Sequence, residues 1–347
     1  MIIGVDAGAL SITDDRLKVG VYRVVLNLLI ELGKQDKKNT YRLYSFRPLE
    51  QGMMKLFGSR MTNIVLLQKG WFRLWLPLQL RKNPVDVFLG LSQTLPSSPG
   101  RTIGFIYDLG FLHYPHAYPD SLPHLKKQTE DLVKRADGLV TISHAVANDV
   151  RKQYNIPGSK ITVSYPGVDS RFKPTGEKYT SQHPYFLFVG ALKRGKNIPT
   201  LLKAFEKFRK KSKEQYELLL IGGDYWLDPA IEPSKGVKRL GFVPDSQLPN
   251  YYRGATALIM PSLWEGFCLP AVEAMASGCP VIASNAGALP EIVGDAGILV
   301  EAMDTDGFTN AMRAVLLDGS LKGKGKKRSR LFSWPAMAKA VLCEISG

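Results

Sequence analysis

The sequence is poor in the residues that build covalent or metal-based scaffolds. It has three cysteines and five histidines in 347 residues. The cysteines, Cys268, Cys279 and Cys343, cannot all pair and form no CxxC motif, which excludes a disulfide-rich secreted domain and predicts reduced thiols in a cytoplasmic protein. No His, Cys or carboxylate residues gather at metal-ligand spacing, so we expect no bound metal.

Long apolar runs and nucleotide-binding fingerprints are also missing. No apolar run approaches the roughly 18 residues that a membrane helix needs, and the start, MIIGVD, lacks the regions of a signal peptide. Gly20 is not part of a GxGxxG motif, and the run that ends at Asn197 fails the GxxxxGK[ST] pattern. These absences argue against a dinucleotide-dependent dehydrogenase and a P-loop enzyme.

Acidic residues are the minority charge. There are 46 Lys and Arg against 31 Asp and Glu, a net charge of +15, which favours anionic partners such as nucleotides and phospholipid surfaces. Nucleic acid is disfavoured as a partner, because the chain lacks aromatic-basic RNA motifs and helix-turn-helix spacing. The densest basic run, either a solvated face or a contact surface, contains Lys322, Lys324, Lys326, Lys327, Arg328 and Arg330.

Short apolar runs alternate with helical patterns along the whole chain, which predicts an α/β fold with open parallel sheets. The length favours two domains, residues 1–170 and 185–331. Between them, residues 171–184 are polar, contain two prolines and lack periodicity, as in a linker. The expected strands are 1–5, 41–46, 63–67, 85–89, 103–107, 139–142, 161–165, 185–189, 217–221, 237–242, 256–260 and 280–283.

The stretch 255–284 predicts a strand, a tight loop, a helix and a second strand. Pro270 is expected at the first helical position and Gly278 just beyond the helix end. Backbone N–H groups at this N-terminus form a site for phosphate, and they belong to Phe267, Cys268 and Leu269. Glu265 and Glu273 flank that site and suit sugar hydroxyls, which a carboxylate accepts in pairs. The alternative is a capped helix whose acids favour the dipole.

Three other stretches have two interpretations each. Arg194 and Lys196 follow a strand and a glycine, as in a diphosphate clamp or in a solvated basic loop. The DxD of residues 304–306 precedes a helix, so we expect a helix cap rather than a metal site. The aromatic and basic run 71–82 could contact a membrane surface, or it could pack a helix on a sheet, with Pro77 interrupting it.

The run EGFCLPAVEAMASGCPV at residues 265–281 resembles the E-x7-E signature of retaining glycosyltransferase family 4, which has the GT-B fold. The resemblance extends over almost the whole chain and implies two Rossmann-like domains that face a cleft, with residues 332–347 as a helix crossing back to the first domain. Other matching runs are GVDA at 4–7, GVYR at 20–23, YDL at 107–109, TIS at 141–143, YPGVD at 165–169, GALKRGKNI at 190–198, VP at 243–244 and GALPEIV at 287–293.

The resemblance implies a metal-independent, retaining transfer of a hexose from a nucleotide sugar to a glycan or lipid-linked acceptor. Such a reaction belongs to cell-surface polysaccharide assembly, in the cytoplasm or at the inner face of the membrane. No cofactor is implied. The members that this opening most resembles act on mannose, so GDP-mannose is the first candidate donor and a UDP-hexose the other.

The resemblance also assigns roles within the site. Glu265 would bind the sugar hydroxyls, Glu273 the ribose, and the turn at Phe242 and Val243 the base. The diphosphate would be bound by Gly20, Arg194, Lys196 and the amides of Phe267, Cys268 and Leu269.

Two departures from the family pattern leave a second hypothesis open. The family usually has His-Asp-Leu beside the donor sugar. This chain has Tyr107 in place of the histidine and keeps the aspartate as Asp108. A phenol can donate a hydrogen bond but does not titrate near neutral pH. His113 and His116 are candidates to replace that histidine, or they are ordinary core or surface residues. Because Ala191 also replaces a common arginine, the alternative is a GT-B protein that binds its ligands without turnover.

Overall fold

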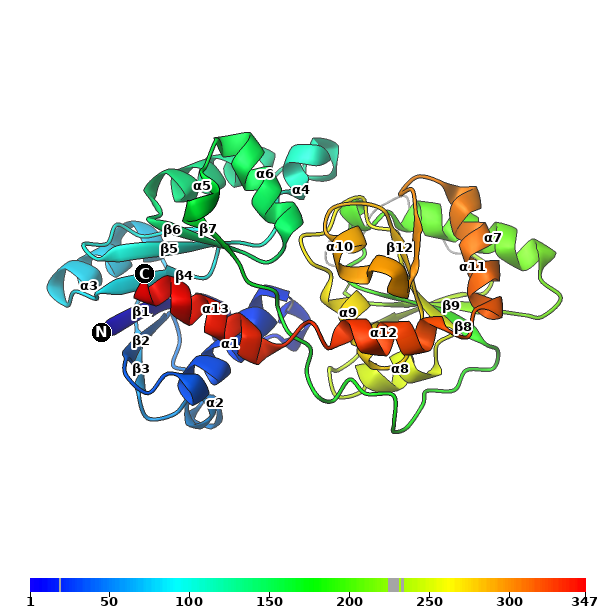
Figure 1. Ribbon diagram of the computed structural model, residues 1–347, viewed down its shortest axis with the longest axis horizontal. Helices are drawn as coiled ribbons and strands as arrows, with labels where there is room; N and C mark the ends of the chain where they lie inside the picture. Colours follow the sequence, from blue (N-terminus) through cyan, green and yellow to red (C-terminus); the bar gives the residue numbers. More distant parts are fainter. Residues whose placement is uncertain (19, 224–230, 232–233) are drawn as a thin grey trace. The chain divides into compact units, whose positions relative to one another are not determined.

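The computed structural model describes every residue except Val19, 224–230 and 232–233, and the chain divides into two compact units (Figure 1). The first unit contains residues 1–111, 118–167 and 333–347. The second contains residues 112–117 and 168–332. The last fifteen residues therefore belong to the unit in which the chain begins.

The first unit is built on a seven-stranded parallel sheet in the order β3-β2-β1-β4-β5-β6-β7. Strands β4 and β6 are buried throughout and β5 nearly so, because helices cover both faces, which suits their near-continuous apolar sequences. The strands are β1 (Ile2–Asp6), β2 (Thr40–Ser45), β3 (Met61–Val65), β4 (Val87–Gly90), β5 (Arg101–Ile106), β6 (Gly138–Thr141) and β7 (Ile161–Val163).

Helices lie on both faces of this sheet, with α5 and α6 on one side and α1 and α13 on the other (Figure 1). Helix α1 buries Val24, Val25, Leu28, Leu29 and Leu32, which lie at the spacing of one helix face. The helices are α1 (Gly20–Gln35), α2 (Gln51–Phe57), α3 (Leu76–Lys82), α5 (Leu122–Arg135), α6 (His144–Tyr154) and α13 (Trp334–Ser346). The short helix α4 (Gly110–His113) begins in this unit, and its last two residues are counted with the second.

The second unit has a six-stranded parallel sheet in the order β10-β9-β8-β11-β12-β13. Its strands are β8 (Tyr185–Val189), β9 (Glu217–Ile221), β10 (Val237–Gly241), β11 (Ala257–Met260), β12 (Val281–Ser284) and β13 (Ile298–Val300). Its helices are α7 (Ile198–Lys211), α8 (Leu248–Gly254), α9 (Leu269–Ala276), α10 (Leu289–Val293), α11 (Thr305–Leu317) and α12 (Leu321–Ser329).

The two sheets share one topology, which determines where ligands bind. In each, the first strand lies beside the fourth, and the order of connection reverses between them. In open α/β sheets, ligands bind at the carboxyl ends of the strands beside such a reversal. For the second unit this position lies between β8 and β11.

Residues 171–184 form no helix or strand, yet they pack against the second unit. The ring of Phe172 is buried against Tyr252, with ring centroids 5.8 Å apart. Tyr179 stacks on Tyr251 at 4.2 Å and donates its N–H to the carbonyl of Asn250. The mostly polar sequence of this stretch gives no sign of these three contacts, two between aromatic rings and one between main-chain groups.

The aromatic and basic run 71–82 forms a π-helical turn followed by α3, with Pro77 at the start of that helix. Trp71, Leu76 and Leu80 are buried, as a helix packed on a sheet requires. Leu74 and Leu78 are each 48% exposed. Within the described residues, no helix is both long and apolar enough to cross a bilayer.

Candidate functional site

Two loops of the second unit meet at the carboxyl ends of β8 and β11. Residues 190–197 follow β8, and residues 261–268 follow β11. The N–H of Leu263 donates to the carbonyl of Gly195 at 2.9 Å, and the side-chain amide of Asn197 donates to the carbonyl of Pro261 at 3.0 Å. The two loops are therefore fixed to each other at the reversal point of the sheet.

Asn197 is the central anchor of the first loop. It is buried and left-handed, with φ of 53°, a conformation that asparagine tolerates better than most residues. Its amide also donates to the carbonyl of Ala302 at 2.6 Å, and its Oδ1 accepts from the Thr200 hydroxyl at 2.7 Å. This network fixes the backbone that carries Lys196.

Lys196 and Glu265, which the sequence assigns to different parts of the donor, form an ion pair. Nζ of Lys196 lies 2.5 Å from Oε1 of Glu265, and the two side chains are 17% and 10% exposed. The hydroxyl of Ser262 donates to the same Oε1 at 2.5 Å. Arg194, in the same short turn, is exposed.

The backbone of Glu265 is held as closely as its side chain. Its carbonyl accepts from the N–H of Ala288 at 2.8 Å. Gly287 has φ of 58°, and a Cβ there would lie 2.4 Å from the Glu265 carbonyl oxygen. Only glycine fits that position without displacing Glu265.

Helix α9 begins one residue earlier than the sequence predicts, so Pro270 is its second residue rather than its first. The reason is Cys268, which precedes the helix in a left-handed conformation with φ of 78°, so that Leu269 starts the helix. Cys268 is buried, and burial raises the pKa of its thiol, which keeps it protonated. The backbone of residues 267–269 lies at the helix N-terminus, as the sequence predicts.

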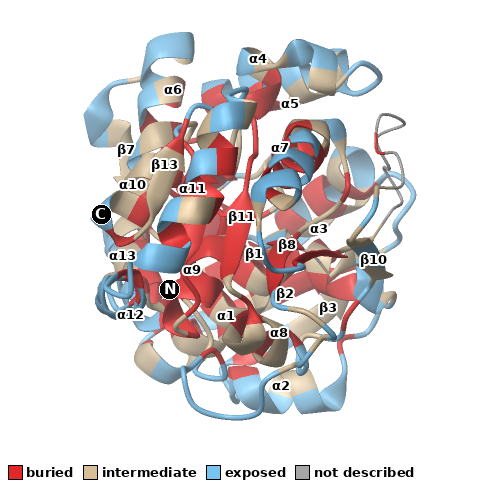
Figure 2. Cartoon of the chain, turned by 90° about the vertical axis from the view of Figure 1, so that its right-hand side faces the viewer, coloured by how far each residue is buried: buried red, intermediate tan, exposed pale blue. Residues whose placement is uncertain are grey.

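Glu273 lies on the buried side of α9, which Figure 2 shows as one of the buried elements of the second unit. It is 4% exposed, and its Oε2 accepts a hydrogen bond of 2.9 Å from the hydroxyl of Tyr252. Tyr252 is itself fully buried. The proposed contact of Glu273 with a ribose stays a prediction.

The predicted base-binding turn follows β10. Gly241 has φ of 66° and lies at an irregularity of the β9–β10 pairing, so the chain turns away from the sheet here. Phe242 is 39% exposed, whereas Val243 is buried. An exposed aromatic ring beside turning backbone can meet the flat face and the edge of a base.

The DxD sequence is used within the fold. Asp304 caps α11 by accepting from the N–H of Gly307 at 2.8 Å, as the sequence predicts. Asp306 pairs with Lys207 at 2.9 Å. Within the described residues, no three His, Cys, Asp or Glu side chains come together as metal ligands would.

Tyr107 is buried within the first unit, and its predicted contact with a donor sugar stays a prediction. The residue follows β5 and is buried, and its hydroxyl donates to the carbonyl of Leu91 at 2.9 Å. Because a phenol has one proton to donate, that hydrogen bond uses it. Burial raises the pKa of Tyr107, so the phenol stays neutral.

The other predicted residues of the first unit lie at helix starts. Asp108 accepts from the N–H of Gly110 and so starts α4. Gly20 is exposed at the start of α1, and apart from its chain neighbours and its own helix no atom of the described residues lies within 4 Å of where its Cβ would be. Gln93, a non-glycine residue with φ of 54°, is not among the predicted site residues. It accepts from the N–H of Tyr107 at 3.2 Å and donates to the carbonyl of Asp108 at 3.3 Å.

Asp6, at the carboxyl end of β1, is a buried carboxyl that was also missed. It accepts from the N–H of Gly8 at 3.0 Å, while its Oδ2 has no hydrogen-bond partner among the described residues. Burial raises its pKa above the usual value for aspartate.

His113 is the nearest histidine in sequence to the position that Tyr107 occupies. The structure counts residues 112–117 with the second unit, and the His113 ring stacks on Trp264 at 3.7 Å and 14°. Trp264 immediately precedes Glu265. Of the two candidate histidines, His113 is thus adjacent to the Glu265 loop, whereas His116 packs on Tyr114.

Comparisons with known proteins show which family this chain belongs to. The Glycosyltransferase Family 4 model matches residues 20–172, and the Glycosyl transferases group 1 model matches residues 171–332. O-antigen chain mannosyltransferase B of Escherichia coli is 28% identical over 269 residues, which cover 72% of this chain and 71% of that protein. O-antigen chain mannosyltransferase RfbU of Salmonella typhimurium is 33% identical over 200 residues, which cover 55% of this chain and 54% of that protein, about half of its length.

A solved structure shows the same fold. The Anabaena protein HepE in complex with UDP and glucose matches with a TM-score of 0.73 and 15% identity, over 100% of this chain and 99% of that one.

Proposed function

The chain belongs to the glycosyltransferases of group 1 and family 4, and from that membership we propose that it transfers mannose from a nucleotide sugar to a glycan or lipid-linked acceptor. Its two Rossmann-like sheets are the GT-B fold of such enzymes. The mannose assignment is supported by the two O-antigen mannosyltransferases, and GDP-mannose is the first donor to test.

One observation carries the proposal. Lys196, Glu265 and the N-terminus of α9 come together at the carboxyl ends of β8 and β11, the place where such sheets bind ligands. Lys196 and the main-chain N–H groups supply positive charge for a diphosphate. The carboxylate of Glu265, a few residues before the start of α9, supplies an acceptor for sugar hydroxyls.

The chemistry proposed for these residues is stabilisation of the leaving group. When the bond from the sugar to the diphosphate breaks, negative charge grows on the diphosphate, and Lys196, Arg194 and the amides at residues 267–269 offset it. Retention of the anomeric configuration is part of the proposal through the E-x7-E resemblance. Metal independence is part of it because Asp304 and Asp306 already serve a helix cap and an ion pair.

The experiment is a transfer assay with GDP-mannose and a panel of UDP-hexoses, in which NMR of the product reports the anomeric configuration. We expect transfer from one donor, with retention, in the presence of EDTA. Glu265→Ala should abolish transfer, while the matched variant Glu206→Ala, at an exposed glutamate of α7, should leave it intact. Activity lost to EDTA and restored by manganese would contradict metal independence. Binding of donor without transfer would support the alternative of a binding protein.

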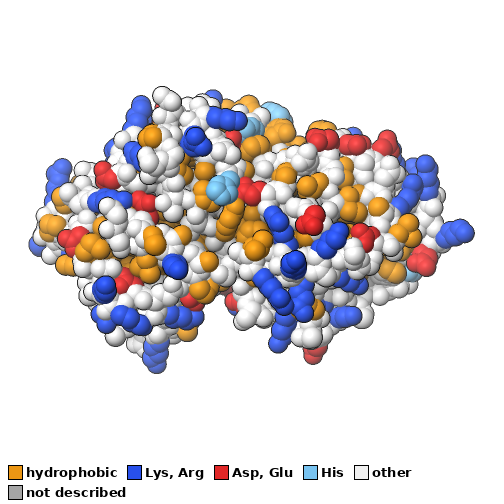
Figure 3. All heavy atoms as spheres, in the orientation of Figure 1, with side chains coloured by type: hydrophobic (Ala, Val, Ile, Leu, Met, Phe, Trp, Pro, Cys, Tyr) orange, Lys and Arg blue, Asp and Glu red, His pale blue; other side chains and the backbone are white. Residues whose placement is uncertain are grey.

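We further propose that a lipid-linked acceptor brings the enzyme to the cytoplasmic face of a membrane through the basic surface of α12. This helix buries Leu321, Gly325 and Ser329 against α9, and its remaining face is lysine-rich. Figure 3 shows Lys and Arg side chains gathered over this helix. An anionic bilayer attracts each such side chain by about 1 kcal/mol.

Flotation with liposomes tests this surface. Binding to anionic vesicles should fall steeply as salt rises, because salt screens exposed charges. Replacing Lys324 and Lys327 by glutamine should weaken it, whereas the same change at Lys37 and Lys38, two exposed lysines of the first unit, should weaken it less. Equal binding to neutral and anionic vesicles would contradict the proposal.

A further inference from the structure

The ion pair between Lys196 and Glu265 occupies both groups before any donor arrives. The 2.5 Å contact lies in a site where the two side chains are 17% and 10% exposed, so the charges are poorly screened by water. A donor diphosphate therefore meets a neutralised lysine. To gain the full charge of Lys196, the ligand competes with the Glu265 carboxylate.

The two partners differ in how firmly they are held. Glu265 keeps the Ser262 hydrogen bond at its side chain and the Ala288 hydrogen bond at its carbonyl. Ser262 is fully buried, and its own carbonyl accepts from the hydroxyl of Ser284 at the end of β12. The ammonium group of Lys196, by contrast, ends a flexible four-carbon stem. When the pair opens, Lys196 is the partner that moves.

We propose that the Lys196–Glu265 pair is a switch that the donor diphosphate opens, and that Ser262 is the positioning residue for the carboxylate that is released. The inference rests on the proposed function. The diphosphate carries more negative charge than one carboxylate, so Lys196 pairs with the diphosphate in place of Glu265. Glu265, still held by Ser262, is then free to accept hydroxyls of the sugar. A ligand without a diphosphate leaves the pair closed.

The first test measures GDP and UDP binding by titration calorimetry. Glu265→Gln preserves the shape and the hydrogen bond from Ser262 but removes the charge that competes for Lys196. We therefore expect the variant to bind the nucleoside diphosphate about tenfold more tightly than wild type, although it should transfer poorly. The control is Glu206→Gln, which makes the same change in the exposed Lys210–Glu206 pair, 2.7 Å apart, and should bind as wild type does. Unchanged or weaker binding by Glu265→Gln would overturn the switch.

The second test concerns Ser262. Ser262→Ala should lower kcat about tenfold while the affinity for GDP or UDP stays within about twofold, because these ligands lack the sugar. In the Glu265→Gln background, Ser262→Ala should cause no further loss of kcat, since Ser262 acts through the carboxylate. A further loss there, or a parallel loss of nucleotide affinity, would overturn the positioning role. Thermal melts of each variant exclude misfolding as the cause.

The outcomes separate this inference from its premise. If the wild-type chain binds neither GDP nor UDP, the proposed function fails and the switch fails with it. If the wild type binds and transfers while Glu265→Gln does not gain affinity, the switch alone is wrong.

Discussion

At the scale of single residues, a glycine at 287 decides where Glu265 lies. Gly287→Ala should destabilise the second unit by about 2 kcal/mol, because a left-handed non-glycine residue costs about 1–2 kcal/mol and the new Cβ would displace the Glu265 carbonyl. Transfer activity should fall with it. Denaturant unfolding and a transfer assay measure the two effects.

The control is Gly319→Ala, since no atom lies within 4 Å of the Cβ position at Gly319 and its φ is not positive. That variant should unfold and transfer as wild type does. Wild-type stability in Gly287→Ala would show that the loop shifts freely and that the close approach has no consequence.

Tyr107 supports a different prediction from the one its sequence position suggests. Tyr107→Phe leaves the carbonyl of Leu91 buried without its partner, which should cost about 1–3 kcal/mol of unfolding free energy. The value of kcat/KM for any donor should change by less than about threefold, because the hydroxyl proton is already donated to the carbonyl of Leu91.

Tyr154→Phe is the matched control, since Tyr154 is half-buried and no described residue bonds its hydroxyl. A tenfold loss of kcat/KM in Tyr107→Phe at unchanged stability would place the hydroxyl at the donor after all.

The sequence could predict the residues that carry charge in this site but not those that hold them. A charged side chain beside a strand end or a helix start seldom has a purely structural role. The sequence therefore marks Lys196 and Glu265 as candidates. Ser262, Asn197 and Gln93 are ordinary polar residues whose partners lie 3 to 105 positions away in the chain. Only the folded chain shows those pairs, and it also shows that Tyr107 points to Leu91.

At the scale of elements, helical and strand periods predicted most of the framework. The spacing in α1 and the apolar runs at β8, β9 and β11 were sufficient, because each element has one clear buried pattern. The predicted start of α9 was wrong by one residue, because a cysteine at position 268 does not by itself indicate a left-handed backbone conformation. The order of strands in each sheet is likewise set by contacts between distant segments.

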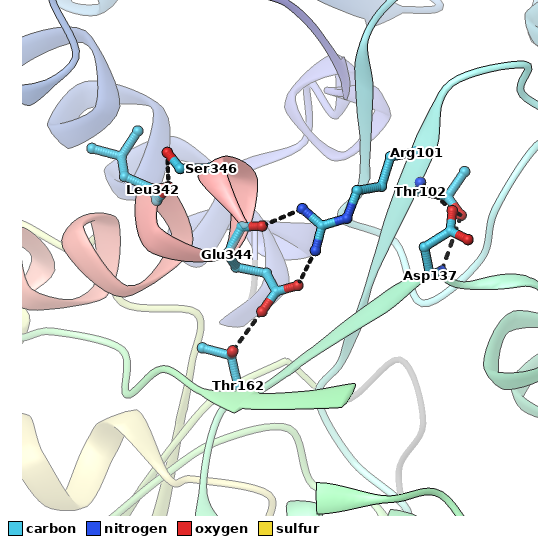
Figure 4. A network of polar contacts seen from close by, with 7 residues as sticks. All are labelled: Arg101, Thr102, Asp137, Thr162, Leu342, Glu344 and Ser346. Atoms are coloured by element: carbon cyan, nitrogen blue, oxygen red, sulfur yellow. Dashed lines mark hydrogen bonds and ion pairs between the residues drawn. The ribbon is translucent and has the colours of Figure 1, made fainter. Parts of the chain in front are cut away.

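Helix α13 offers the clearest test at this scale. Glu344 on α13 bonds Arg101 on β5 at 2.7 Å and Thr162 on β7 at 2.6 Å, as Figure 4 shows. Glu344→Ala should therefore destabilise the first unit by about 1–2 kcal/mol, less than a buried charged hydrogen bond because the side chains are partly exposed. Denaturant unfolding measures it.

Ser346→Ala provides the comparison, because among the described residues the Ser346 hydroxyl bonds only the carbonyl of Leu342 in its own helix (Figure 4). Its stability should stay within about 0.5 kcal/mol of wild type. If Glu344→Ala were equally neutral, the apolar face of α13, with Met337, Val341 and Ile345, would hold the helix alone.

At the scale of the whole molecule, each unit has its own sheet and core, so a ligand of one need not stabilise the other. GDP or UDP at 100 times its Kd should protect the amides of the second unit by about 2.7 kcal/mol and leave the α1–α13 core of the first unit unchanged. Hydrogen exchange resolved by peptide reports both. Inorganic phosphate at equal ionic strength is the control. Equal protection of both units would contradict this and would show that the nucleotide also contacts the first unit, as the resemblance implies for Gly20.

The assignment of residues 333–347 to the first unit has a consequence for synthesis. The ribosome completes β1 to β7 early, but it must then make the 165 residues 168–332 before α13 exists. At about 5–20 residues per second, that interval is on the order of ten seconds or more. During it, the α1 surface that α13 covers is open to chaperones and to other nascent chains. The first unit to be made is thus the last to be finished.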